Sequence, residues 1–153
     1  MDRAGTRGLA GVALALLFVL ITQGVSSDHA SASIAHRRRA HMLSLINEDR
    51  AFRDKAPLKL NVELSMYAKR HSLQMATKGY LFHTDDLGSK LTGLDWSIAG
   101  ENVGAGSTLD GVEDAFMRST PHRRNILRTG FDHAAVGVVH SNGKFWVTVI
   151  FYG

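Results

Sequence analysis

The sequence predicts an α+β fold in which helices cover both faces of a central antiparallel sheet. Two segments near the C-terminus, residues 134–140 and 144–152, are rich in β-branched and aromatic residues. Asn142-Gly143 lies between them and is a strong signal for a tight hairpin turn. Both faces of the last segment are largely apolar, with Phe145, Val147, Val149 and Phe151 on one and Trp146, Thr148, Ile150 and Tyr152 on the other. This pattern is typical of a strand that is covered on both sides.

The N-terminal residues have the three-part pattern of a secretory signal peptide. Arg3 and Arg7 precede an apolar run over residues 9–21, and small residues follow it. The run has about 13 residues, whereas a membrane-spanning helix needs ~20. Cleavage is expected after Ser27 or after Ala32, and an uncleaved N-terminal anchor is the alternative.

This pattern divides the chain into three parts. Residues 1–32 are assigned to the signal peptide, 33–39 to a flexible lead-in and 40–153 to one folded domain. No second long apolar run follows, so we expect no transmembrane segment after signal removal and a protein that is secreted or associated with the cell envelope.

Composition limits the chemistry of the exported domain. The chain has no cysteine, which excludes disulfides, thiol nucleophiles and thiolate zinc sites. Its 18 Lys and Arg residues exceed its 14 Asp and Glu residues, and the formal net charge is +4. This balance suits anionic envelope polymers or lipid headgroups, although a solvated basic surface would show the same excess. Nucleic acid is not expected as a partner, because the basic runs have no aromatic platform near them.

Helical spacing of apolar residues predicts the first two helices. Met42, Leu45, Ile46 and then Phe52 form a stripe along the first, over residues 38–50. The second helix is expected between an N-cap at Asn61 and a C-cap at Gly79. His71 falls on its apolar stripe and is interpreted as a packing residue.

The third helix is expected to start near Asp110, because Asp110 and Glu113 have capping-box spacing. Pro121 disfavours helix at the residue before it, so the chain should turn there. A short helix should follow over "HRRNIL" and end by Gly130.

Three polar residues in turn-rich or glycine-rich segments are candidates for a site. His83 lies in "YLFHTDD", Glu101 in "AGENVGAG" and His122 in "STPHRRNIL". Each has an alternative interpretation, as an exposed loop histidine or a solvated acid. A glutamate held inward among glycines would instead need hydrogen-bond donors to offset its burial.

These segments together resemble one known family. "SMYAKRHSLQMA", "FHT", "GENVGAG", "STPHRRNIL", "VGVV" and "FWVTVIFYG" follow, in order, the pattern of bacterial CAP domains, the superfamily of cysteine-rich secretory, antigen 5 and pathogenesis-related proteins. The resemblance covers residues ~40–153. It implies a three-layer α-β-α sandwich with a central antiparallel sheet.

The resemblance also implies a cleft that holds two histidines and two glutamates. His83 and His122 match the histidines, Glu101 matches the first glutamate, and Asn125 matches a position that usually carries a polar amide. Ser119 stands where the second glutamate is expected, so the set lacks one acid.

The incomplete set leaves three hypotheses for function. A secreted binding module would hold a divalent ion such as zinc through His83 and His122, with Glu101 as an optional third ligand, or would bind a lipid, an envelope polymer or another protein. A metal-dependent hydrolase of peptides or envelope polymers is the alternative, with Glu101 as base. The third hypothesis is a purely structural hydrogen-bonded core beneath an interaction surface. A Ser-His-acid hydrolase using Ser119 lacks a nucleophile elbow. We therefore place binding ahead of catalysis.

Overall fold

The computed structural model describes the backbone of residues 12–153 and the side chains of residues 29–153. By its contacts the chain divides into two units, residues 1–34 and residues 35–153, and the folded domain is the second. The predicted signal peptide, residues 1–32, lies almost wholly outside the described side chains. Within the described part of the chain, no helix is long and apolar enough to cross a membrane.

Helix α1 spans Val12–Ala51, and its last turns belong to the domain. Residues 33–39, expected as a flexible lead-in, are helical. Met42 and Ile46 are fully buried, as the apolar stripe predicts. Phe52 was wrongly included in that stripe, because it lies past the end of the helix and is 85% exposed.

The central sheet has four strands in the order β1-β3-β4-β2. Strands β2 (Ala99–Gly106), β3 (His133–Ser141) and β4 (Lys144–Tyr152) are antiparallel, and the short β1 (Lys59–Leu60) pairs with β3 in parallel. The predicted hairpin between β3 and β4 is confirmed. Asn142 and Gly143 both have the positive φ that its tight turn requires, +51° and +71°. Strand β2 lies at one edge of the sheet.

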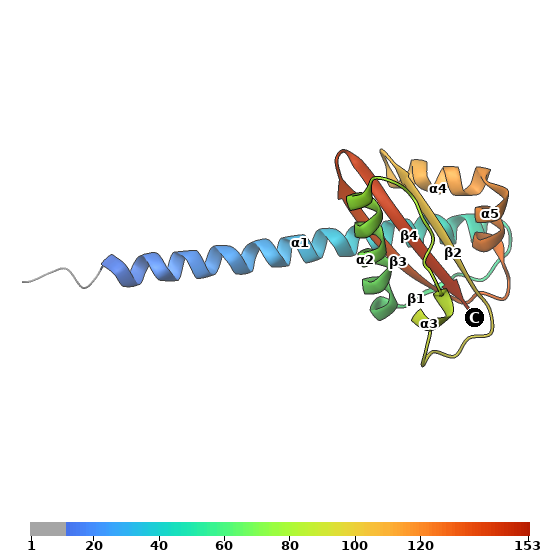
Figure 1. Cartoon of the computed structure of the whole chain (residues 1–153), viewed down its shortest axis with the longest axis horizontal. Helices are drawn as coiled ribbons and strands as arrows, with labels where there is room; N and C mark the ends of the chain where they lie inside the picture. The colour runs from blue at the N-terminus through green and yellow to red at the C-terminus, as the bar shows by residue number, and fades with distance from the viewer. Residues whose placement is uncertain (1–11) are drawn as a thin grey trace, which may run out of the picture. The chain divides into compact units, whose positions relative to one another are not determined.

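Helices cover both faces of this sheet and confirm the three-layer sandwich (Figure 1). Helices α2 (Val62–Lys78) and α3 (Leu87–Lys90) lie on one face. Helices α4 (Leu109–Arg118) and α5 (Thr120–Leu127) lie on the other, together with the last turns of α1. Strand β4 divides its side chains as predicted. Val147, Val149 and Phe151 enter the core beneath α1, α4 and α5, while Trp146, Ile150 and Tyr152 pack toward α2.

Helix α2 is placed on the sheet by a glycine. Both predicted caps are confirmed, since the Asn61 side chain accepts from the Leu64 N–H and Gly79 adopts a left-handed φ of +78°. A Cβ atom at Gly137 of β3 would lie 2.1 Å from the backbone carbon of Ala68 in α2. The helix and strand backbones can therefore meet only because this position has no side chain.

Helix α4 begins at Leu109, next to the predicted start near Asp110 but with a different cap, and α5 begins two residues before the predicted segment "HRRNIL". Thr108, not Asp110, caps α4, and its hydroxyl accepts from the Gly111 N–H at 3.0 Å. The capping box fails because Glu113 turns into the core, where it is 5% exposed. Helix α5 starts at Thr120, with Pro121 inside its first turn, where a fixed φ and a missing N–H cost nothing.

Candidate functional site

The candidate site is built around the edge strand β2. Side chains alternate along a strand, so Glu101 faces α2 while its two neighbours face α4 and α5. A Cβ atom at Gly100 would lie 2.9 Å from Asn125 Oδ1, and one at Gly104 would lie 2.7 Å from a ring carbon of Phe116. The glycines of "AGENVGAG" therefore let α4 and α5 pack directly on this strand.

Glu101 is held inward by donors, as its burial requires. Its side chain is 5% exposed. Oε2 accepts from His83 Nδ1 at 2.8 Å and from the Thr84 N–H at 2.9 Å, and Oε1 accepts from the Thr84 hydroxyl at 2.6 Å. Both carboxylate oxygens are therefore occupied by the segment after α2.

The Glu101 carboxylate fixes the orientation of His83. The His83 side chain is 61% exposed, so its ring lies at the surface while its partner is buried. A carboxylate can only accept, so Nδ1 carries the hydrogen of this contact. Nε2 of the neutral ring is then left as an acceptor toward solvent or a ligand.

His71 supports the same carboxylate from α2. It is 3% exposed, with Nε2 2.9 Å from the Phe82 carbonyl oxygen and 3.9 Å from Glu101 Oε1. Its ring meets Phe82 edge-on, with centroids 4.9 Å apart. This agrees with its interpretation as a hydrogen-bonded packing residue.

Two asparagines tie α5 to β2 and so position His122. Asn125 Nδ2 donates to the Glu101 carbonyl at 3.2 Å and to Asn102 Oδ1 at 2.9 Å. Asn102 Nδ2 in turn donates to the His122 carbonyl at 3.1 Å. The His122 ring packs on Phe116, with centroids 5.0 Å apart.

His122 and His83 interact electrostatically across this edge of the sheet. Partial burial lowers the pKa of His122 below its usual value, and the nearby His83 lowers it further. Both effects favour the neutral form of the His122 ring. The fold thus brings the four predicted residues, His83, Glu101, His122 and Asn125, to one region.

The donor set does not form a complete metal centre. Within the described residues, no group of three or more His, Cys, Asp or Glu side chains is placed to hold an ion. Glu101 is the nearest third ligand, but both its oxygens already accept hydrogen bonds. Two imidazoles remain, which is fewer than the three protein ligands of a catalytic zinc site.

Other residues of the site were missed or take different places. Thr84 and Asn102 were not singled out, although each stands next to a predicted residue in "FHT" and "GEN". Ser119 connects α4 to α5, and within the described residues its hydroxyl makes no hydrogen bond to His122. Glu113, the acid of α4 that precedes Ser119, lies outside the site and near Asp49 of α1.

Comparison with known proteins identifies this arrangement. Residues 43–151 match the family described as "CAP: Cysteine-rich secretory protein family". The chain belongs to the CAP family. Its fold is held without the cysteines of the family's name, since the chain contains none.

Similar proteins of known sequence or structure support this family and fold. The CAP domain chain is 36% identical over 132 residues to YkwD of Bacillus subtilis (strain 168), a match that covers 82% of this chain and 50% of YkwD. An extracellular protein containing a SCP domain from Bacillus anthracis str. Ames superposes with a TM-score of 0.65 at 25% identity, over 78% of this chain and 41% of that one. An outer surface protein from Borrelia burgdorferi shares the fold, with a TM-score of 0.68 at 18% identity over 76% of this chain and 92% of that one. The chain thus spans about half of YkwD and less of the Bacillus anthracis protein.

Proposed function

We propose that this CAP domain is exported and binds a ligand of the cell envelope at the surface beside His83 and His122. The main support for this proposal is that both carboxylate oxygens of Glu101 already accept hydrogen bonds from the protein. A buried carboxylate with both oxygens accepting hydrogen bonds orients His83, as outer-shell carboxylates orient histidines, and is not available as a general base. The geometry therefore favours recognition over hydrolysis.

Export is supported by two independent observations. The N-terminal sequence has the pattern of a signal peptide. The Bacillus anthracis relative is described as an extracellular protein. An envelope polymer or lipid is the ligand that an exported, basic domain would meet first.

A divalent ion such as zinc is a weaker ligand for the same two histidines. His83 Nε2 and the neutral His122 ring are suitable donors. No third protein ligand accompanies them within the described residues, so water would complete the coordination and the affinity would be low.

Binding of the full chain to isolated envelope fragments tests the proposal. His83→Ala combined with His122→Ala is expected to lower the affinity by about tenfold or more, the equivalent of one charge-assisted hydrogen bond. His140→Ala is the matched control, because His140 is exposed on β3 and lies outside the site. Unchanged binding in the double variant, with a lowered melting temperature, would assign the histidines a structural role instead.

Calorimetry with zinc and a turnover assay separate the other hypotheses. Weak heat that disappears in the double histidine variant is expected for a two-imidazole ion site. Chelator-sensitive hydrolysis of peptidoglycan or peptides, abolished by Glu101→Gln, would replace the binding proposal with the hydrolase.

A further inference from the structure

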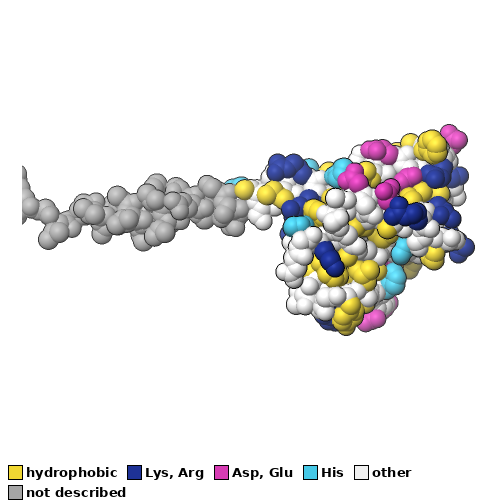
Figure 2. Space-filling model, turned by 90° about the horizontal axis from the view of Figure 1, so that it is seen from above, with side chains coloured by type: hydrophobic (Ala, Val, Ile, Leu, Met, Phe, Trp, Pro, Cys, Tyr) yellow, Lys and Arg dark blue, Asp and Glu magenta, His cyan; other side chains and the backbone are white. Residues whose placement is uncertain are grey.

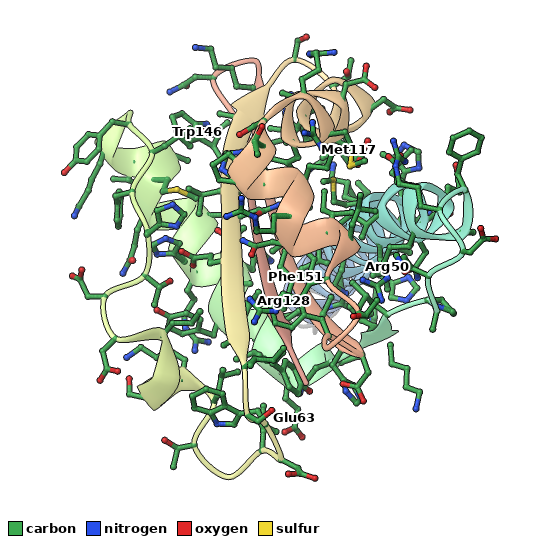
Figure 3. All side chains as sticks on the ribbon, turned by 90° about the vertical axis from the view of Figure 1, so that its right-hand side faces the viewer. Arg50, Glu63, Met117, Arg128, Trp146 and Phe151 are labelled. Carbon is green, nitrogen blue, oxygen red and sulfur yellow. The ribbon has the colours of Figure 1, made fainter. Side chains whose placement is uncertain are left out.

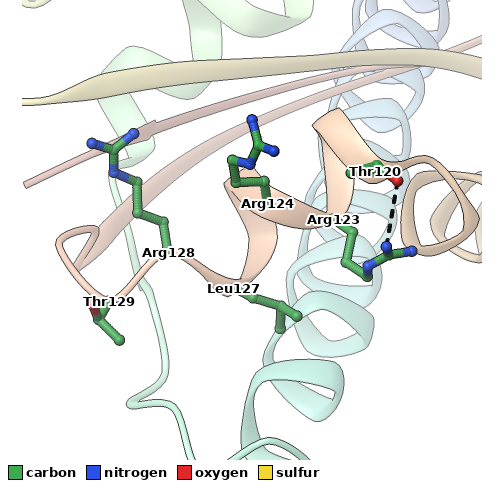
Figure 4. Close-up of a pocket in the computed structure, with 6 residues that line it drawn as sticks. All are labelled: Thr120, Arg123, Arg124, Leu127, Arg128 and Thr129. Carbon is green, nitrogen blue, oxygen red and sulfur yellow. Dashed lines mark hydrogen bonds between the residues drawn. The ribbon is translucent and has the colours of Figure 1, made fainter.

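Helix α5 has a second functional candidate on the side away from His122. Its outer face borders a shallow, open surface pocket of about 510 Å³ (Figure 4). The lining includes three arginines, two threonines and one leucine: Thr120, Arg123, Arg124, Leu127, Arg128 and Thr129. No acidic residue lines it.

The three arginine charges are not neutralised by the protein. In residues 29–153, the ion pairs of other arginines join Arg53 to Asp49 and Arg118 to Asp114, whereas none involves Arg123, Arg124 or Arg128. Figure 2 shows Lys and Arg side chains on the side of the domain that carries α4 and α5, with Asp and Glu side chains among them. The pocket is therefore a concentrated positive surface that lacks a counter-charge.

Part of this surface is held in place before any ligand binds. Arg123 Nη1 donates to the Met117 carbonyl at 2.7 Å and its Nη2 lies 3.5 Å from the Thr120 hydroxyl. The backbone that carries Arg128 is fixed by the buried Arg50, whose Nη1 donates to the Arg128 carbonyl at 3.0 Å (Figure 3). Arg124 and Arg128 extend in the same direction from the ribbon (Figure 4).

We propose that this arginine pocket, made by Arg123, Arg124 and Arg128, binds the phosphate groups of a linear phosphodiester polymer in the cell envelope. Guanidinium groups bind phosphate oxygens in pairs of parallel hydrogen bonds, and the threonine hydroxyls add further donors. This site is separate from the one proposed at His83 and His122, and only its assignment to an envelope polymer rests on the proposed export.

The surroundings of the pocket favour a soluble polymer over a membrane or a nucleic acid. None of the exposed large apolar side chains of the described residues lines the pocket, whereas binding to a bilayer surface needs such side chains. The aromatic ring nearest in the chain, Phe131, is 1% exposed and cannot stack on a base.

The test measures binding of the full chain to poly(glycerol phosphate) of defined length at low and moderate salt. Arg124→Gln and Arg128→Gln are each expected to weaken binding about five- to tenfold, and the pair more, because each removes one charge-assisted contact. Both side chains are exposed, so the variants should remain folded. Arg118→Gln is the matched control, since it removes an equal charge nearby from a residue that does not line the pocket.

The outcomes separate the possible ligands. Saturable binding that is lost in the pocket variants and kept in Arg118→Gln supports the proposal. Equal losses in all three variants, or no binding, would overturn it, because either result leaves only general charge attraction. Pocket-dependent binding to vesicles of 30% anionic phospholipid, or to single-stranded DNA, but not to the polymer, would also overturn it. Polymer binding that is unchanged in the double variant His83→Ala plus His122→Ala would show that the arginine pocket acts independently of the two histidines.

Discussion

Glu113 makes the stability of the domain depend on pH in a direction opposite to that of most carboxylates. Its side chain is buried in α4, and its Oε1 has no hydrogen-bond partner among the described residues. Burial, and then the neighbouring Asp49, raise its pKa from 4.5 to about 8. Glu113 is therefore largely protonated in the native state at neutral pH.

Proton linkage determines whether stability rises or falls with pH. Between pH 4.5 and about pH 8 the unfolded chain ionises Glu113 while the native protein keeps it protonated, so the native state binds more protons. The contribution of Glu113 to the free energy of unfolding is therefore highest below pH 4.5 and falls as the pH rises to about 8. The full difference between the two pKa values corresponds to at most about 5 kcal/mol. Structural relaxation around a newly formed charge should reduce this to about 2–4 kcal/mol.

Glu113→Gln tests this reasoning by imitating the protonated acid. Urea unfolding at pH 5 should give wild type and variant free energies within about 1 kcal/mol of each other. At pH 9 the variant should be more stable by about 2–4 kcal/mol, because it has no proton to lose. Asp114→Asn, an exposed neighbour whose side chain is 69% accessible, is the control and should change stability little at either pH. Equal pH dependence in wild type and Glu113→Gln would refute the reasoning.

Three further predictions concern the core and the two site histidines. Arg50→Met should cost about 3–5 kcal/mol in urea unfolding, because it leaves four buried or half-buried carbonyls without their donor; a loss below about 1 kcal/mol would contradict this. Gly137→Ala should cost about 3 kcal/mol or more, since its Cβ would meet the α2 backbone, whereas Gly88→Ala meets its nearest neighbour at 3.5 Å and should fold as wild type. His83→Ala should raise the pKa of His122 in an NMR titration but leave it below 6.5, because burial is the larger cause. An unchanged His122 pKa would show that the two rings do not interact.

Local signals predicted the parts of the fold that depend on a few adjacent residues. Asn142-Gly143 determines the hairpin because both residues tolerate positive φ, and Asn61 and Gly79 bound α2 for similar local reasons. The two apolar faces of β4 predicted the cover on both sides. The convergence of the site residues was expected only from the family resemblance, because no local pattern places His83 beside Glu101.

Features that depend on contacts between distant residues were missed or misplaced. Thr108 and Asp110 are both acceptable caps, and the burial of Glu113 decides between them. In the sequence, Arg50 is one basic residue at the end of a helix. In the structure, it donates hydrogen bonds to carbonyls 76 to 81 residues away. Such roles follow from the tertiary structure and leave no periodic signal in the sequence.

Helix α5 links the two proposed sites through one short piece of backbone. Its inner residues Asn125 and His122 are joined to β2, and its outer arginines line the pocket. Arg50 bonds the carbonyls of Ile126 and Arg128 at the end of this helix, so it supports both faces at once. In a domain without cysteine, this buried guanidinium joins α1 to α5 and the following loop, a task that disulfides perform in many small secreted domains. Loss of Arg50 should therefore weaken polymer binding and alter the His122 titration together, whereas substitutions on either face alone should affect only one.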